Sequence, residues 1–303
     1  MVRVRAEQQY SRQVDTSMAH TATIFSHLEK KMNRRQSVAA LTLLLAASQA
    51  GAQDSPLVFA VNEGATYRVN PGATAERFKE LAEDLGKLLK QPVKLQAVSD
   101  YKELAAGLAE QRYDLAYVHP AHHAIRAITK SGYSLVAVTK GFTEYRASFM
   151  VKGDSPLKTL ADLKGHKVGA PDEDSITSVI MRATLRDAFG SQTPAATYVK
   201  LQDAVPFMVE NNFVVAGVSA SKAVVKTWQD KGGKVLATSK PVPIKQLIAS
   251  SKLTDAQRAQ IAAYFMSLDQ TPEGKKRLEA LNVSGFEAYD QKALVAMGSW
   301  LGL

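Results

Sequence analysis

A turn rich in hydroxyl groups carries the most informative chemistry in this sequence. Ser175, Thr177 and Ser178 follow a predicted strand and open a stretch with helical periodicity. The first N–H groups of a helix lack partners and carry partial positive charge, so such a helix start favours anions. Capping of the helix by Asp174 or Ser175 explains the same residues. The turn therefore predicts either an anion site or a helix cap.

A group of three histidines is a second candidate for chemistry. His119 and His123 are four residues apart, a spacing that suits two metal ligands on one helix face. However, Pro120 fits the first position of a helix, which implies that His119 precedes it. The sequence has no H-E-x-x-H pattern and no cysteine. We therefore expect a helix start with one histidine facing a cleft, with a metal site at His119, His122 and His123 as the alternative.

Composition excludes several classes of protein. The chain has 303 residues, a length that suggests two domains. Of these residues 46% are hydrophobic and 22% are charged, which is typical of a globular protein. Its net charge of +9 comes from basic residues spread among acidic ones, so no nucleic-acid partner is predicted. G-x-S-x-G, P-loop and G-x-G-x-x-G motifs are absent, and there is no cysteine. We expect no enzyme activity and no cofactor.

The elements that must position these residues alternate between strands and helices. This alternation predicts parallel sheets covered by helices. Ser99 is expected to cap the helix that starts at Tyr101. The predicted strands are 57–62, 93–98, 114–119, 135–140, 147–152, 167–169, 197–201, 214–219 and 235–238, and one further short apolar run spans 246–249. The predicted helices are 74–91, 101–111, 121–131, 175–189, 204–210 and 222–230, followed by packing helices within 254–300.

The N-terminal 52 residues have the pattern of an extension and a secretory signal peptide. The apolar run 38–47 has about half the ~20 residues that a membrane-spanning helix needs. Arg34 and Arg35 precede this run and Ala50-Gly51-Ala52 follows it, which is the order of a cleavable signal. We expect Met32 to be the true start and cleavage to follow Ala52. The mature chain would carry a net charge of +5 and lie in the periplasm.

Three motifs resemble a known family of transport proteins. They are the L-A-D-L-K-G-x-K-V-G-A run at 160–170, the S-x-T-S turn at 175–178 and the D-L-A-Y-V-H-P-A run at 114–121. Together they resemble the phosphonate/phosphite/phosphate-type periplasmic solute-binding proteins of ABC transporters. The resemblance covers nearly all of residues 55–290.

The resemblance implies a type 2 periplasmic binding fold with two α/β lobes, hinge strands and C-terminal packing helices. Residues 53–146 plus 239–303 would form lobe 1, and residues 147–238 would form lobe 2. The hinge strands would lie near 145–148 and 238–242. Ligand would be held in the cleft between the lobes, and closure about the hinge would trap it.

The resemblance also implies which residues bind the ligand. Hydroxyl groups at the helix start would serve lobe 2, and tyrosines near strand ends would face them from lobe 1. The implied ligand-binding residues are Tyr67, Tyr117, His119, Ser175, Thr177, Ser178 and Gln202.

Three positions depart from the family pattern. Gln202 stands where a histidine is expected, and His119 occupies a position that is usually glycine. Val215 replaces an aspartate, which argues against an amine-bearing ligand such as 2-aminoethylphosphonate.

The predicted function is therefore capture of a small oxyanion, phosphonate-, phosphite- or phosphate-like, for an inner-membrane permease. The protein would act as a monomer. Three alternatives stay open at this stage: a ligand-presenting sensor protein for a two-component system, a periplasmic metal-binding protein that uses the histidines, and an enzyme on the same fold, for which the sequence supplies no nucleophile–base pair.

Overall fold

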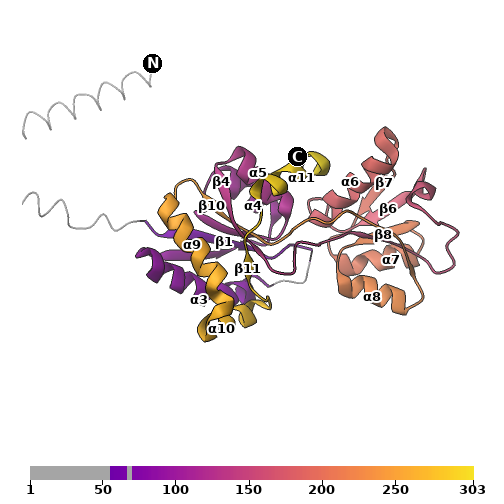
Figure 1. Ribbon diagram of the computed structural model, residues 1–303. Helices are drawn as coiled ribbons and strands as arrows, with labels where there is room; N and C mark the ends of the chain where they lie inside the picture. Colours follow the sequence, from indigo (N-terminus) through magenta and orange to yellow (C-terminus); the bar gives the residue numbers. More distant parts are fainter. Residues whose placement is uncertain (1–54, 67–69) are drawn as a thin grey trace, which may run out of the picture. The chain divides into compact units, whose positions relative to one another are not determined.

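The computed structural model describes residues 55–66 and 70–303, whose helices and strands are labelled in Figure 1. The predicted signal peptide, Met32 and Tyr67 lie outside the described residues. The described part contains two β-sheets, each covered by helices. The division into lobes at residues 146/147 and 238/239 stays a prediction.

The first sheet has the strand order β11-β4-β10-β3-β1-β2. Strands β1, β2 and β3 pair in parallel, whereas β10 and β11 pair antiparallel to their neighbours. The predicted parallel pairing therefore holds for β1, β2 and β3, whereas β10 and β11, which return to this sheet late in the chain, run antiparallel. The strands are β1 (Leu57–Asn62), β2 (Val93–Ala97), β3 (Leu115–Val118), β4 (Tyr133–Thr139), β10 (Gln246–Ser250) and β11 (Phe286–Glu287).

Helices bury both faces of this sheet, as buried strands require. Helices α3 and α9 contact each other, and α10 packs on α3 (Figure 1). Apolar side chains of α3 and α9, including Phe78 and Phe265, share a core with Phe59 of β1, while Leu104 of α4 and Ala124 of α5 cover the other face. The bounds are α3 (Pro71–Leu89), α4 (Tyr101–Ala109), α5 (Ala121–Lys130), α9 (Asp255–Ser267) and α10 (Pro272–Leu281).

The second sheet has the strand order β7-β6-β8-β5-β9. Strand β5 pairs antiparallel with β8 and β9, and β6 pairs in parallel with β7 and β8. The strands are β5 (Ser148–Val151), β6 (Lys167–Ala170), β7 (Ala195–Tyr198), β8 (Ala216–Ser219) and β9 (Lys234–Thr238). The helices that pack on this sheet are α6 (Ile176–Phe189), α7 (Val205–Glu210) and α8 (Lys222–Asp230).

The C-terminal helix, α11 (Gln291–Leu301), contacts one helix from each of the two sheets' covering layers. It packs on α5 and on α6, and its Leu294 and Leu301 join a core that also contains Ile125 and Ile180. The chain crosses between the sheets through two segments that meet at Tyr145 and Val242, which form an isolated antiparallel bridge. These are the two segments that the sequence predicted as hinge strands.

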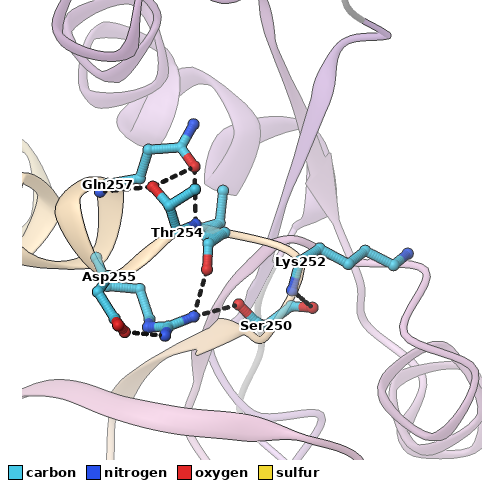
Figure 2. A network of polar contacts seen from close by, with 7 residues as sticks. Ser250, Lys252, Thr254, Asp255 and Gln257 are labelled. Atoms are coloured by element: carbon cyan, nitrogen blue, oxygen red, sulfur yellow. Dashed lines mark hydrogen bonds and ion pairs between the residues drawn. The ribbon is translucent and has the colours of Figure 1, made fainter.

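Local polar contacts explain where the helices begin. Asp100, not Ser99 as predicted, caps α4, because its carboxylate accepts from the backbone N–H of Glu103. A capping box of Thr254 and Gln257 starts α9, and Figure 2 shows these two residues bonded to each other. Within the described residues, no helix is long and apolar enough to cross a membrane.

Candidate functional site

The hydroxyl-rich turn forms the start of α6, as predicted. Ser175 is the N-cap residue, and its Oγ accepts from the backbone N–H of Ser178 at 3.2 Å. The Ser178 hydroxyl donates to the carbonyl oxygen of Pro171 at 3.0 Å. Both serines are buried. Their hydroxyl groups therefore hold the turn that ends β6 and begins α6.

Thr177 instead takes part in a polar network that joins three segments of the chain. Its Oγ1 lies 2.9 Å from the hydroxyl oxygen of Tyr145, which lies in one of the two segments that cross between the sheets. The side-chain amide of Gln202 donates to the same hydroxyl oxygen at 3.2 Å. Thr177 and Gln202 are buried, and Tyr145 is half-buried. We call Thr177, Tyr145, Gln202 and His119 the polar network.

Gln202 is fixed by four further hydrogen bonds. Its Oε1 accepts from the Ser219 hydroxyl and the Ala220 N–H, both at 2.8 Å, and from the Ser221 N–H at 3.1 Å. Its backbone N–H donates to the carbonyl oxygen of Thr66 at 3.1 Å. The amide oxygen thus occupies a cluster of donors at the end of β8 and the start of α8. The amide nitrogen consequently points to Tyr145.

His119 lies at the end of β3 and faces the network from the first sheet. Its ring meets the Tyr145 ring edge-on, with 5.9 Å between the centroids. Burial, and to a lesser degree the Lys245 ammonium, lowers the pKa of His119 to about 3, so the imidazole is neutral at pH 7. Gly64 leaves room for this ring: its φ is +96°, and an added Cβ would lie 2.7 Å from His119 Cδ2.

Tyr117 lies in the core, although the sequence placed it among the ligand-binding residues. Its side chain is 2% exposed and packs against Phe78 and Phe286. Its hydroxyl oxygen lies 3.1 Å from Thr139 Oγ1. We therefore leave Tyr117 out of the site proposed below.

His122 and His123 stack on each other, with 4.1 Å between the ring centroids. Burial lowers the pKa of His122 well below its usual value and that of His123 to about 4, so both are neutral at pH 7. Within the described residues, no three His, Cys, Asp or Glu side chains form a group that could hold a metal ion.

Val215 lies just before β8, whereas Ser219, at the other end of this strand, contacts Gln202. Four residues of strand separate the two positions by about 13 Å. A carboxylate at position 215 would not reach the polar network. The valine at this position therefore does not determine which ligands bind at the network.

Sequence reasoning missed Tyr145 as a site residue and assigned it only to a hinge segment. No motif surrounds it, and its partners are 26, 32 and 57 positions away along the chain. The signal that was available is a tyrosine within a segment already predicted to be a hinge strand. Its hydroxyl, with the neutral donors Thr177 and Gln202, suits recognition of an anion through hydrogen bonds.

A sequence-family comparison matches residues 64–294 to the family described as "ABC transporter, phosphonate, periplasmic substrate-binding protein". No curated protein matches the chain significantly.

Solved structures of similar fold include binding proteins of phosphonate transporters. XAC2383 from Xanthomonas citri, bound to ATP, aligns with a TM-score of 0.69 at 14% identity, over 82% of this chain and 98% of that one. PhnD1 from Prochlorococcus marinus, in complex with methylphosphonate, gives 0.63 at 17% identity, over 81% and 97%. A binding-protein component of an ABC phosphonate transporter from Pseudomonas aeruginosa gives 0.59 at 18% identity, over 82% and 86%. The fold is that of type 2 periplasmic binding proteins.

These findings do not support the sensor and metal-binding alternatives. Proteins of this family bind a small-molecule ligand in the periplasm, serve a membrane permease and are not enzymes. The family match covers more than half of the chain and agrees with the fold. The chain therefore belongs to the periplasmic substrate-binding proteins of phosphonate-type ABC transporters.

Proposed function

We propose that this protein captures a small phosphorus oxyanion at the polar network and delivers it to its permease. The observation that carries the proposal is the meeting of Thr177, Tyr145 and Gln202 at one point, next to the start of α6. Two proteins of similar fold bind compounds that contain phosphorus, methylphosphonate and ATP. A helix start adjacent to neutral donors favours such an anion.

The oxyanion would exchange hydrogen bonds with the network. In the structure, the Tyr145 hydroxyl connects Thr177 and Gln202 directly. Phosphonate oxygens would replace these contacts and accept from the hydroxyls of Tyr145 and Thr177 and from the Gln202 amide. Hydrogen bonds to a charged acceptor are about twice as strong as those between neutral groups, so each new contact would be stronger than the one it replaces.

The other predicted residues take different roles in this proposal. Ser175 and Ser178 hold the start of α6 through bonds within the turn. His119, neutral at pH 7, contacts Tyr145 from the first sheet and orients its ring. Tyr67, outside the described residues, stays a candidate from its place in the sequence alone.

The remaining expectations complete the proposal. Residues 1–52 would contain the extension and the signal peptide that export the chain, and the mature protein would act as a monomer. Residues 53–146 with 239–303 would move against residues 147–238, and the segments that meet at Tyr145 and Val242 would act as the hinge.

The test removes single hydroxyl groups and measures methylphosphonate binding by isothermal titration calorimetry. Thr177→Val and Tyr145→Phe should each weaken binding by about 1–3 kcal/mol, the value of a hydrogen bond to a charged group. Thr184→Val is the matched control, because Thr184 lies on the same helix and its hydroxyl donates to the carbonyl oxygen of Ile180. Unchanged affinity in both site variants would refute this placement of the ligand.

A further inference from the structure

Lys245 lies at the edge of the first sheet where β3 and β4 end. It directly precedes β10, whose first residue, Gln246, pairs with Val118 of β3 and Val138 of β4. Ligands of open α/β sheets bind outside the carboxyl ends of the strands. Lys245 therefore lies at the edge on which a ligand is expected.

The two crossing segments place Lys245 close to the polar network. Phe142 lies three residues before Tyr145 on one segment, and Lys245 lies three residues after Val242 on the other. The Ile244 N–H donates to the Phe142 carbonyl oxygen at 2.9 Å, and the Lys245 ammonium lies 3.9 Å from the centroid of the Phe142 ring. This cation–π contact holds the charge beside the segment that carries Tyr145.

The backbone of Lys245 is in the left-handed region, with a φ of +60°. This conformation is unfavourable for a residue with a Cβ, and residues held in it cluster at ligand sites. Three hydrogen bonds hold it here: the Lys245 N–H donates to the His119 carbonyl oxygen at 3.2 Å, and the Lys245 carbonyl oxygen accepts from the N–H and the Oγ1 of Thr139 at 3.2 and 3.0 Å. The bond to His119 fixes Lys245 to a member of the polar network.

The Lys245 side chain is half-buried, and no ion pair engages its ammonium in the part of the chain that the structure describes. Glu63 and Arg77 act on its pKa in opposite directions, but they pair with each other, and Glu63 also accepts from the Thr74 hydroxyl. Burial lowers the pKa of Lys245, and an anion bound nearby would favour the charged form. The ammonium is therefore available to an anionic ligand.

The polar network itself supplies no charge. Thr177, Tyr145 and Gln202 contribute hydroxyl and amide groups, and the His119 imidazole is neutral at pH 7. A phosphonate with two negative charges loses hydration when it enters such a site, so a positive charge nearby favours its binding. The Lys245 ammonium already acts on the network, since it contributes to the lowered pKa of His119.

We infer that Lys245 supplies the positive charge by which this protein selects doubly charged oxyanions, phosphonates and phosphate monoesters, over singly charged ones such as sulfonates. The inference rests on the proposed function, because the oxyanion must lie at the polar network. Lys245 acts on the charge of the ligand through its electrostatic field, whereas the hydrogen bonds of the network serve both kinds of anion. Phe142 is a positioning residue, since its ring holds the ammonium.

The experiment compares methylphosphonate with methanesulfonate, which has a similar shape and one negative charge fewer. Both affinities are measured by titration calorimetry at a pH above the second ionisation of methylphosphonate, and a sulfonate too weak for direct titration is measured by competition. Lys245→Met keeps the length of the side chain and removes its charge. It should weaken methylphosphonate about 10-fold or more and methanesulfonate about 3-fold, because the electrostatic energy scales with the ligand charge.

Three further variants serve as controls. Lys245→Arg keeps the charge and should keep most of the preference for methylphosphonate. Lys245→Gln is a second variant without the charge, and its losses should match those of Lys245→Met. Lys140→Met removes a lysine that follows β4 at the same sheet edge but pairs with Asp269, and it should leave both affinities within about 2-fold.

The outcomes separate this inference from the proposed function. If the charge-free variants leave the methylphosphonate affinity unchanged, or weaken both probes equally, the inference is overturned and the proposed function stands. A loss in Lys245→Arg as large as that in Lys245→Met would also overturn it, because a retained charge would then have no effect. If methylphosphonate does not bind the unchanged protein, the proposed function fails, and the inference fails with it.

Discussion

We expect acid to destabilise this protein, because the side chains of His122 and His123 are buried. The His123 ring lies between His122 and Tyr101, and its Nε2 is buried with no hydrogen-bond partner in the described part of the chain. Burial, and secondarily the Arg126 charge, lowers the pKa of His123 from 6.5 to about 4. A proton therefore binds the unfolded chain more readily than the folded one.

The sign and size of the effect follow from linkage. Between the folded pKa of about 4 and the unfolded pKa of 6.5, the unfolded state holds more protons, so the stability contributed by neutral His123 is complete above 6.5 and is lost as the pH falls. Between about pH 7.5 and about pH 5 the loss for this one group is about 2 kcal/mol. His119, whose pKa burial lowers to about 3, loses a similar amount.

The assay compares urea unfolding of the protein and of His123→Gln at both pH values. The variant removes the titrating group, so its free energy of unfolding should fall by about 2 kcal/mol less than that of the unchanged protein. Any cost of the substitution that does not depend on pH cancels in this comparison. His166→Gln, in an exposed turn, is the control and should keep the full pH dependence.

One result would refute the reasoning. If His123→Gln loses as much stability between the two pH values as the unchanged protein, the imidazole is protonated as easily in the folded state as in the unfolded one. The ring would then be in contact with water, and the packing of His122, His123 and Tyr101 would differ from the structure.

Three further substitutions test the surroundings of the polar network. Gly64→Ala should lower the free energy of unfolding by at least about 1 kcal/mol, because φ is +96° and the new Cβ would press on His119; thermal unfolding checks this. Gln202→Ala should cost about 1–3 kcal/mol in urea unfolding, since it leaves the Ser219 hydroxyl and the Ala220 N–H without their acceptor and the Ser221 N–H with only Ser219 Oγ. An unchanged midpoint would contradict it. Tyr117→Phe should leave methylphosphonate affinity unchanged, because its hydroxyl contacts Thr139 in the core; weaker binding in calorimetry would return Tyr117 to the site.

Much of the fold was predictable because periodicity and caps are local. The strand at Leu57–Asn62 was predicted with the bounds that it has, and the predicted helix at Thr254 begins with a capping box. Errors occurred where two signals competed or where an element was too short to show a pattern. Asp100 caps α4 in place of the neighbouring Ser99, and the two-residue strand at Phe286–Glu287 was missed because it is too short for a pattern.

The sequence by itself determined the family, the type 2 fold and the hydroxyl-rich start of α6, because these depend on the order of motifs and on nearest neighbours along the chain. Only the tertiary structure decided which side chains meet. Residues on both faces of β3 are buried, so alternation could not show that Tyr117 faces α3 and the core. Tyr145 joins Thr177 and Gln202 because two segments cross between the sheets, and such long-range contacts leave no pattern in a single sequence.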